Sequence, residues 1–319
     1  MNEAFIVSIL TITLRAGTSL LYATLGEIYT ERAGILNLGV EGVMMMGAAT
    51  SFAVAYHTES GWLGLAAALA IGAILGLIHA FLTVTMRADQ VVSGLAMTLF
   101  GSGLAAFMGQ RLGPGRTTMV GLQGPKFARF PIPLLSDIPI IGQSFFNQDL
   151  LVYALYILTP LMWFYLYKTQ FGLHLRAIGE KPQAADAMGV NVGRLRYLYT
   201  IFGGMLMGIA GAHLSLSYLQ GWADNITGGR GWIAIALVIF ATWDPFRALL
   251  GALLFGGVNA IQFRLQAAGT TIPAPFLSML PYIFTIVVLV IVTVYESFSK
   301  RVGAPAALGL PYIRGERTG

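Results

Sequence analysis

Two polar side chains, Asn37 and Glu41, lie within the second apolar stretch of the sequence, AGILNLGVEGVMMMGAATSFAVAYH. A carboxylate is costly in hydrocarbon, so such a group usually faces a cavity or a bonding partner. Because these residues are four apart, one helix face would carry both, where they would line the path of a polar solute. The alternative is a structural role, in which Glu41 bonds to backbone, to Arg15 or to Arg32. The glycines within Gly34–Gly47 weaken a helix and let backbones approach, so the sequence predicts a broken second helix.

Asn259 and Gln262 are further candidates for the path, because they lie three residues apart in a later apolar stretch. They would either line the path from the opposite side or bond to neighbouring helices. His79 and His213 also lie in apolar stretches, where a histidine either packs or carries protons. No metal site or cofactor is predicted, since the run Met44–Met46 has no further soft ligands nearby.

The composition defines the class of protein that must position these residues. Of the 319 residues, 56% are hydrophobic and only 10% are charged, whereas soluble domains carry roughly 25% charged residues. A helix needs about 20 apolar residues to cross a bilayer. The sequence therefore predicts an all-α, polytopic membrane helix bundle that forms a single domain over 1–319, with about nine spans (eight to ten). The predicted spans are 4–24, 34–56, 62–86, 90–110, 149–167, 198–219, 231–243, 247–265 and 276–296. Of these, 231–243 is short. It is either a separate span that a tight turn joins to 247–265, or one half of a re-entrant pair with it.

Basic residues predict the orientation of the bundle in the membrane. The connection 168–197 carries several lysines and arginines and few acids, which is typical of a cytoplasmic loop. Counting the other loops places the N-terminus outside, the tail 297–319 inside and the long connection 111–148 outside. The proline-rich and glycine-rich connection 111–148 is either a wandering loop or a structured docking segment. Because the basic residues are spread over loops between spans, nucleic-acid binding is not expected.

A short helix is predicted inside the loop 168–197. Pro182 suits a first helical position, the residues that follow tolerate a helix, and Gly189 suits the position after its end. A helix of so few residues is not stable alone in water, so this segment needs a surface on which to dock. The sequence contains no GxxxxGK[ST], HExxH or GxSxG motif, so no ATPase or hydrolase activity is expected of the chain itself.

Two stretches, ERAGILNLGVEGVMMMGA and LRAIGEKPQAADAMGVNVGRLR, resemble the permease subunits of bacterial ABC importers. The family is the branched-chain amino acid and ribose permease superfamily, and within it the two stretches are most similar to the nucleoside and simple-sugar permeases. The resemblance implies a multi-pass subunit of the bacterial inner membrane, surrounded by lipid, that pairs with a second, distinct permease. It also implies two cytoplasmic ATP-binding subunits, or one tandem ATPase, and an extracytoplasmic solute-binding protein, often a lipoprotein.

In that family, the stretch that matches Arg176–Arg196 supplies a coupling helix that sits in a groove of the ATPase. The resemblance therefore assigns coupling to six residues of this chain: Gly179, Pro182, Ala184, Ala185, Asp186 and Gly189. Without the resemblance, the residues leave two alternative functions open. One is an ion-coupled secondary transporter that uses Glu41 and the histidines, and the other is a membrane assembly protein, against which the polar second stretch argues.

Overall fold

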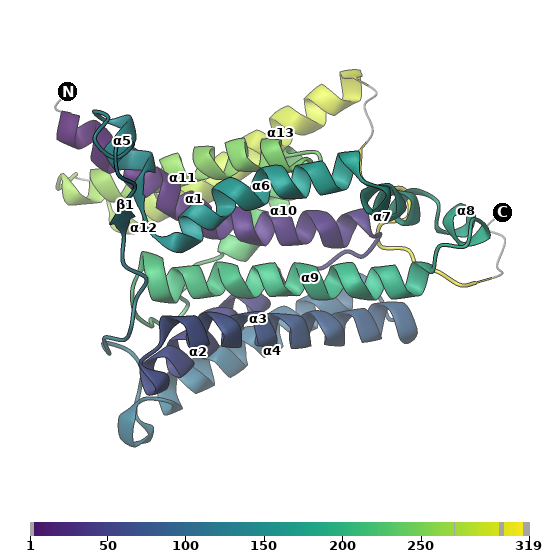
Figure 1. Cartoon of the computed structure of the whole chain (residues 1–319), viewed down its shortest axis with the longest axis horizontal. Helices are drawn as coiled ribbons and strands as arrows, with labels where there is room; N and C mark the ends of the chain where they lie inside the picture. The colour runs from purple at the N-terminus through teal and green to yellow at the C-terminus, as the bar shows by residue number, and fades with distance from the viewer. Residues whose placement is uncertain (1–2, 271, 300–302, 315–319) are drawn as a thin grey trace.

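The computed structural model describes residues 3–270, 272–299 and 303–314, and this part of the chain is mostly helical (Figure 1). The longer helices are α1 (Glu3–Arg32), α2 (Val40–Thr58), α3 (Gly61–Ala80), α4 (Gln90–Arg111), α6 (Leu150–Lys168), α7 (Gln170–Glu180), α9 (Val192–His213), α10 (Arg230–Phe240), α11 (Pro245–Ala267) and α13 (Leu280–Ser299). The short elements are α5 (Ile141–Phe145), α8 (Pro182–Ala187), α12 (Ala274–Ser278), the π-helices η1 (Phe81–Thr85) and η3 (Leu214–Tyr218), the 3₁₀ turn η2 (Pro114–Arg116) and the strands β1 (Phe130–Pro131) and β2 (Asn147–Gln148).

Within the described residues, six helices are long and apolar enough to cross a membrane. They are Phe5–Arg32, Gly61–Thr85, Gln90–Arg111, Leu150–Lys168, Val192–Tyr218 and Pro245–Ala267. The predicted count of about nine spans is not confirmed. The predicted span 34–56 begins with non-helical backbone, and the span 231–243 corresponds to α10, whose 11 residues reach only about 16 Å.

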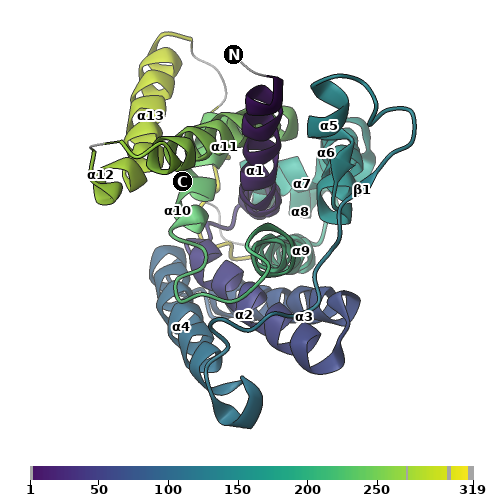
Figure 2. The same ribbon diagram turned by 90° about the vertical axis from the view of Figure 1, so that its left-hand side faces the viewer.

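The bundle has α9 at its centre. In the view along the long axis, α2, α3 and α4 lie on one side of α9, while α1, α6, α11 and α13 lie on the other (Figure 2). Glycines allow the closest crossing: a Cβ atom on Gly72 of α3 would collide with the carbonyl of Gly204 on α9, and the reverse also holds. Such small residues let helix backbones meet inside a membrane.

Two predicted boundaries are wrong. The first helix continues to Arg32 instead of ending near residue 24, so Glu27 and Glu31 lie on a helix and not in a loop. The predicted loop 168–197 contains α7 and α8, and it ends earlier than predicted. Helix α9 begins at Val192 instead of near residue 198, because Asn191 caps it by accepting a hydrogen bond from the Arg194 N–H at 2.9 Å. An asparagine in this position is a readable start signal.

The connection 111–148 is a structured segment. Strands β1 and β2 pair in antiparallel fashion, and Phe127 N–H donates to the carbonyl of Leu216 at 3.0 Å. This segment lies at the same end of the bundle as the start of α1, opposite to α7 and α8 (Figure 1). The residues 303–314 lie at the α8 end, opposite to the start of α1 (Figure 1).

Candidate functional site

The predicted short helix is present as α8, at one end of the bundle. Pro182 occupies its first turn, and the side chains of Pro182 and Ala185 are buried against the protein. Ala184 is exposed on the other face, and Met188 after the helix is 84% exposed. Gly189 has φ +85°, which only glycine adopts readily. Helix α8 thus leans on the protein with one face and presents the other.

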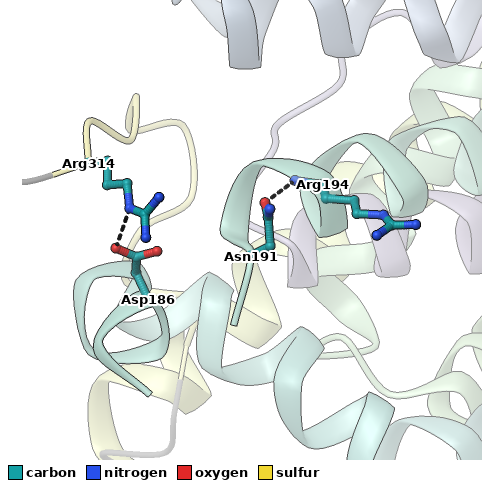
Figure 3. A network of polar contacts seen from close by, with 4 residues as sticks. All are labelled: Asp186, Asn191, Arg194 and Arg314. Atoms are coloured by element: carbon teal, nitrogen blue, oxygen red, sulfur yellow. Dashed lines mark hydrogen bonds and ion pairs between the residues drawn. The ribbon is translucent and has the colours of Figure 1, made fainter. Parts of the chain in front are cut away.

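The remaining predicted coupling residues, Gly179 and Asp186, contact a distant part of the chain. The carbonyl of Gly179 accepts a hydrogen bond from Ala307 N–H at 2.8 Å, and a Cβ on this glycine would collide with the Arg32 carbonyl. Asp186 forms an ion pair with Arg314 at 3.2 Å (Figure 3). Two cavities of about 440 and 350 Å³ adjoin α8, and residues 306–314 line part of both.

Glu41 lies in the first turn of α2, and its carboxylate bonds to the start of α10. One oxygen accepts from the Thr227 hydroxyl at 2.5 Å and the Gly229 N–H at 2.9 Å, and the other accepts from the Gly231 N–H at 2.6 Å. The side chain is buried, at 6% exposure. An anion at the positive end of a helix is stabilising. Glu41 therefore caps α10 through backbone bonds, as the structural alternative allowed. Within the described part of the chain, its carboxylate makes no hydrogen bond to Arg15 or Arg32.

Asn37 lies in the non-helical stretch between α1 and α2. Its N–H donates to the Glu27 carboxylate at 3.0 Å, and its side-chain oxygen accepts from the Gly39 N–H at 2.8 Å. Its amide also reaches the Met207 sulfur at 3.7 Å. The prediction that Asn37 and Glu41 share one helix face is wrong, because the helix begins only at Val40. The predicted break thus lies before α2, and α2 itself is continuous.

Asn259 and Gln262 lie on α11 and are buried, at 8% and 7% exposure. The Asn259 amide donates to the carbonyl one turn earlier, at Phe255 (3.1 Å). This region of α11 packs near Thr13 of α1, whereas Asn37 bonds to Glu27. Those two positions on α1 lie about 21 Å apart along the helix axis. The structure does not bring Asn37 and Asn259 together.

The two histidines within the bundle differ in their contacts. His79 lies 3.0 Å from the Ser93 hydroxyl and 3.1 Å from the Leu36 carbonyl, so both of its ring nitrogens are engaged. His213 is fully buried and stacks on Tyr218 at 6.3 Å, and neither of its ring nitrogens has a hydrogen-bond partner among the described residues. The contacts of His79 connect α3 and α4 with the stretch before α2.

Two features of the site were predicted as loop charges and are buried on helices instead. Glu27 and Glu31 lie one turn apart and are both buried, and Glu31 accepts from the Trp243 indole at 2.5 Å. Arg196 is buried at 1% exposure in α9 and bonds to segments far away in the sequence. The four-residue spacing of the acids was visible in the sequence, but it signals a shared face only once the helix is known to extend that far.

Fold and site together define a multi-pass membrane protein with a short, partly exposed helix at one end of its bundle. The chain belongs to the branched-chain amino acid transport system permease component family, whose model matches residues 8–293.

Several relatives match this chain over nearly their whole length. TsgC13 of Haloferax volcanii, which its name assigns provisionally to a glucose ABC transporter, is 41% identical over 98% of this chain and 99% of its own. The guanosine ABC transporter permease NupQ of Bacillus subtilis is 38% identical over 98% of this chain and 99% of its own. The nucleoside ABC transporter permease NupC of Lactococcus lactis is 36% identical, over 93% of this chain and 94% of its own.

Proposed function

We propose that this chain is the permease subunit of an ATP-driven ABC importer and forms half of the translocation path for a nucleoside or a simple sugar. Helix α8 is the observation that carries the proposal. The helix has only six residues, with one buried face and one exposed face, and Gly189 follows its end. It lies at the end of the bundle in a chain of the permease family. A helix of this kind suits a docking contact with a cytoplasmic ATPase.

The same proposal assigns the two ends of the bundle. The α8 end, with the basic loop 168–197 and the tail 297–319, faces the cytoplasm, because positive charge accumulates there. Residues 300–302 and 315–319 of that tail lie outside the described residues. The end with the N-terminus and the structured segment 111–148 faces outward, where a solute-binding lipoprotein would deliver its cargo.

The partners follow from the missing nucleotide-binding motif. Two ATP-binding subunits, or one tandem ATPase, would hydrolyse ATP and move α8. A second, homologous permease would complete the path, so that the two permeases rock between outward and inward states. This chain would contribute half of the path and no covalent chemistry, in the inner membrane of the cell.

The path candidates receive different roles in this proposal. Glu41 would shape the path by holding the start of α10, since its carboxylate accepts three hydrogen bonds from groups of 227–231. Asn37 would fix the stretch that leads into α2. Asn259 and Gln262 stay candidates for contact with solute from α11.

Uptake in proteoliposomes tests this function. The chain is reconstituted with the partner permease, ATPase and binding protein that its adjacent genes encode, and ATP-dependent uptake of labelled guanosine and glucose is measured. The variant Gly189→Pro should abolish uptake while the protein still inserts, since proline cannot adopt φ +85°. The control Gly269→Pro alters a glycine of similar φ, +69°, at the end of α11 away from α8, and should retain uptake.

Two results would overturn the proposal. Normal ATP-dependent uptake by Gly189→Pro would exclude α8 as the point of coupling. Uptake by this chain alone, without an ATPase and sensitive to an uncoupler, would identify an ion-coupled secondary transporter instead.

A further inference from the structure

Residues 303–314 return from α13 and pack against the α7–α8 region; we call this segment the strap. Ala307 is buried at 6% exposure and donates its N–H to the Gly179 carbonyl at 2.8 Å. The Ala306 N–H lies 3.3 Å from the Glu180 carboxylate. Gly179 is also one of the residues that the family resemblance assigns to coupling. The strap thus contacts the chain immediately before α8.

Arg196 holds the middle of the strap. Its Nε donates to the Ala33 carbonyl at 3.1 Å, and one terminal nitrogen donates to the Leu310 carbonyl at 3.2 Å. Its guanidinium also lies 6.0 Å from the ring of Tyr312. Burial of a cation costs desolvation free energy, and the hydrogen bonds that Arg196 donates offset part of that cost. One side chain therefore connects the end of α1, the start of α9 and the strap.

Arg314 holds the far end of the strap to α8. Its Nε lies 3.2 Å from the Asp186 carboxylate, and the Asp186 side chain is only 23% exposed while that of Arg314 is 82% exposed (Figure 3). Arg194, on the same end of the molecule, points away from this pair, and its side chain makes no hydrogen bond or ion pair with the described residues (Figure 3). Arg314 thus forms the ion pair between the strap and α8, and Tyr312 of the strap also lies beside Asp186.

We propose that the strap positions α8 for the ATPase subunit, with Arg196 anchoring the strap and Arg314 tying it to Asp186. Asp186 then acts in coupling through the strap, and not by direct contact with the ATPase. Because Arg196 also bonds to Ala33, displacement of the strap is transmitted to the stretch that precedes α2. This inference rests on the proposed function of α8.

A charge-swap series tests the role of Asp186. ATP hydrolysis stimulated by guanosine or glucose is measured in the reconstituted complex, and the wild-type complex tests the proposed function by itself. Arg314→Asp and Asp186→Arg should each lower the stimulation by about three- to fivefold, the effect expected for a partly exposed pair. The double variant Asp186→Arg/Arg314→Asp should return to within about twofold of wild type, because the two charges meet again. The control Asp186→Arg/Arg194→Asp makes the same exchange without contact and should stay as low as Asp186→Arg.

A second measurement follows the strap without any partner. The chain has no cysteine, so Ala307→Cys introduces a single thiol at a buried position, and Gly303→Cys introduces one where no atom lies within 4 Å of a Cβ. In purified protein, maleimide should label the A307C variant slowly and the G303C variant rapidly. Adding Arg196→Lys should speed labelling of A307C about tenfold, through loss of the bond to Leu310.

The outcomes separate the two proposals. If wild type shows no solute-stimulated ATP hydrolysis, the proposed function fails and the strap has no such role. If wild type is stimulated but Arg314→Asp behaves like it, or the double swap stays as low as the single variants, then Asp186 acts directly and the strap inference fails. Equal labelling of the A307C and G303C variants would refute the docked strap itself.

Discussion

Replacing Glu41 by glutamine should destabilise the protein by a predictable amount. Glutamine keeps one oxygen for the Thr227 hydroxyl and the Gly229 N–H, but it sets an NH₂ group against the Gly231 N–H, which loses its 2.6 Å bond. A hydrogen bond to a charged acceptor contributes about 1.5–3 kcal/mol. The lost negative charge at the start of α10 adds roughly 0.3–2 kcal/mol. We expect Glu41→Gln to lower the free energy of unfolding by about 2–5 kcal/mol.

Thermal unfolding in detergent, followed by tryptophan fluorescence, measures this effect. With the unfolding entropy that globular proteins of this length show, that loss lowers Tm by roughly 3–7 °C. Glu59→Gln is the matched control, because Glu59 follows the other end of α2 and is exposed, so its Tm should stay unchanged. An unaltered Tm for Glu41→Gln together with lost uptake would refute the reasoning, since Glu41 would then act on solute or protons and not as a helix cap.

Three further substitutions have expected outcomes. Gly72→Val should prevent stable folding, because the new side chain meets the backbone at Gly204, whereas Gly103→Val has open space around it; detergent-solubilised yield and monodispersity compare the two. Gly189→Ala has room for its Cβ, but the residue must keep φ +85°, which costs about 1–2 kcal/mol at the end of α8. It should lower ATPase coupling and reduce Tm by no more than a few degrees. Full coupling with an unchanged Tm would contradict this expectation. Tyr29→Phe removes a 2.6 Å bond to an α6 carbonyl and should destabilise the bundle by about 1 kcal/mol, measured as a small fall in Tm; no fall would show that the bond adds nothing net.

Local signals in the sequence predicted α8 well. Pro182 and Gly189 act within a few residues of themselves, one by its fixed φ and the other by tolerating a positive φ, and the structure contains both features. The membrane class also follows from composition, since long apolar stretches have few other uses. Six of the predicted spans correspond to helices that are long and apolar enough to cross.

The candidate site was harder to predict, because it depends on contacts between distant residues. Arg196 was interpreted as a loop charge, yet it bonds to a carbonyl 114 residues away. The bonds of Glu41 span 186–190 residues and depend on where α10 begins. Asn37 was misplaced because the helical period was extended across a stretch where glycines interrupt it. No local pattern contains this information, whereas the start of α9 at Asn191 was readable and was missed.

The strap has a consequence for the order in which the protein is assembled. Its residues leave the ribosome after all of the helices of the bundle, α13 included. The chain around Gly179 and Asp186 therefore lacks its packing partner throughout the synthesis and insertion of the spans. An ATPase that recognises α8 only when the strap is docked would ignore unfinished permeases, so these contacts would also act as a check on the completeness of the membrane subunit.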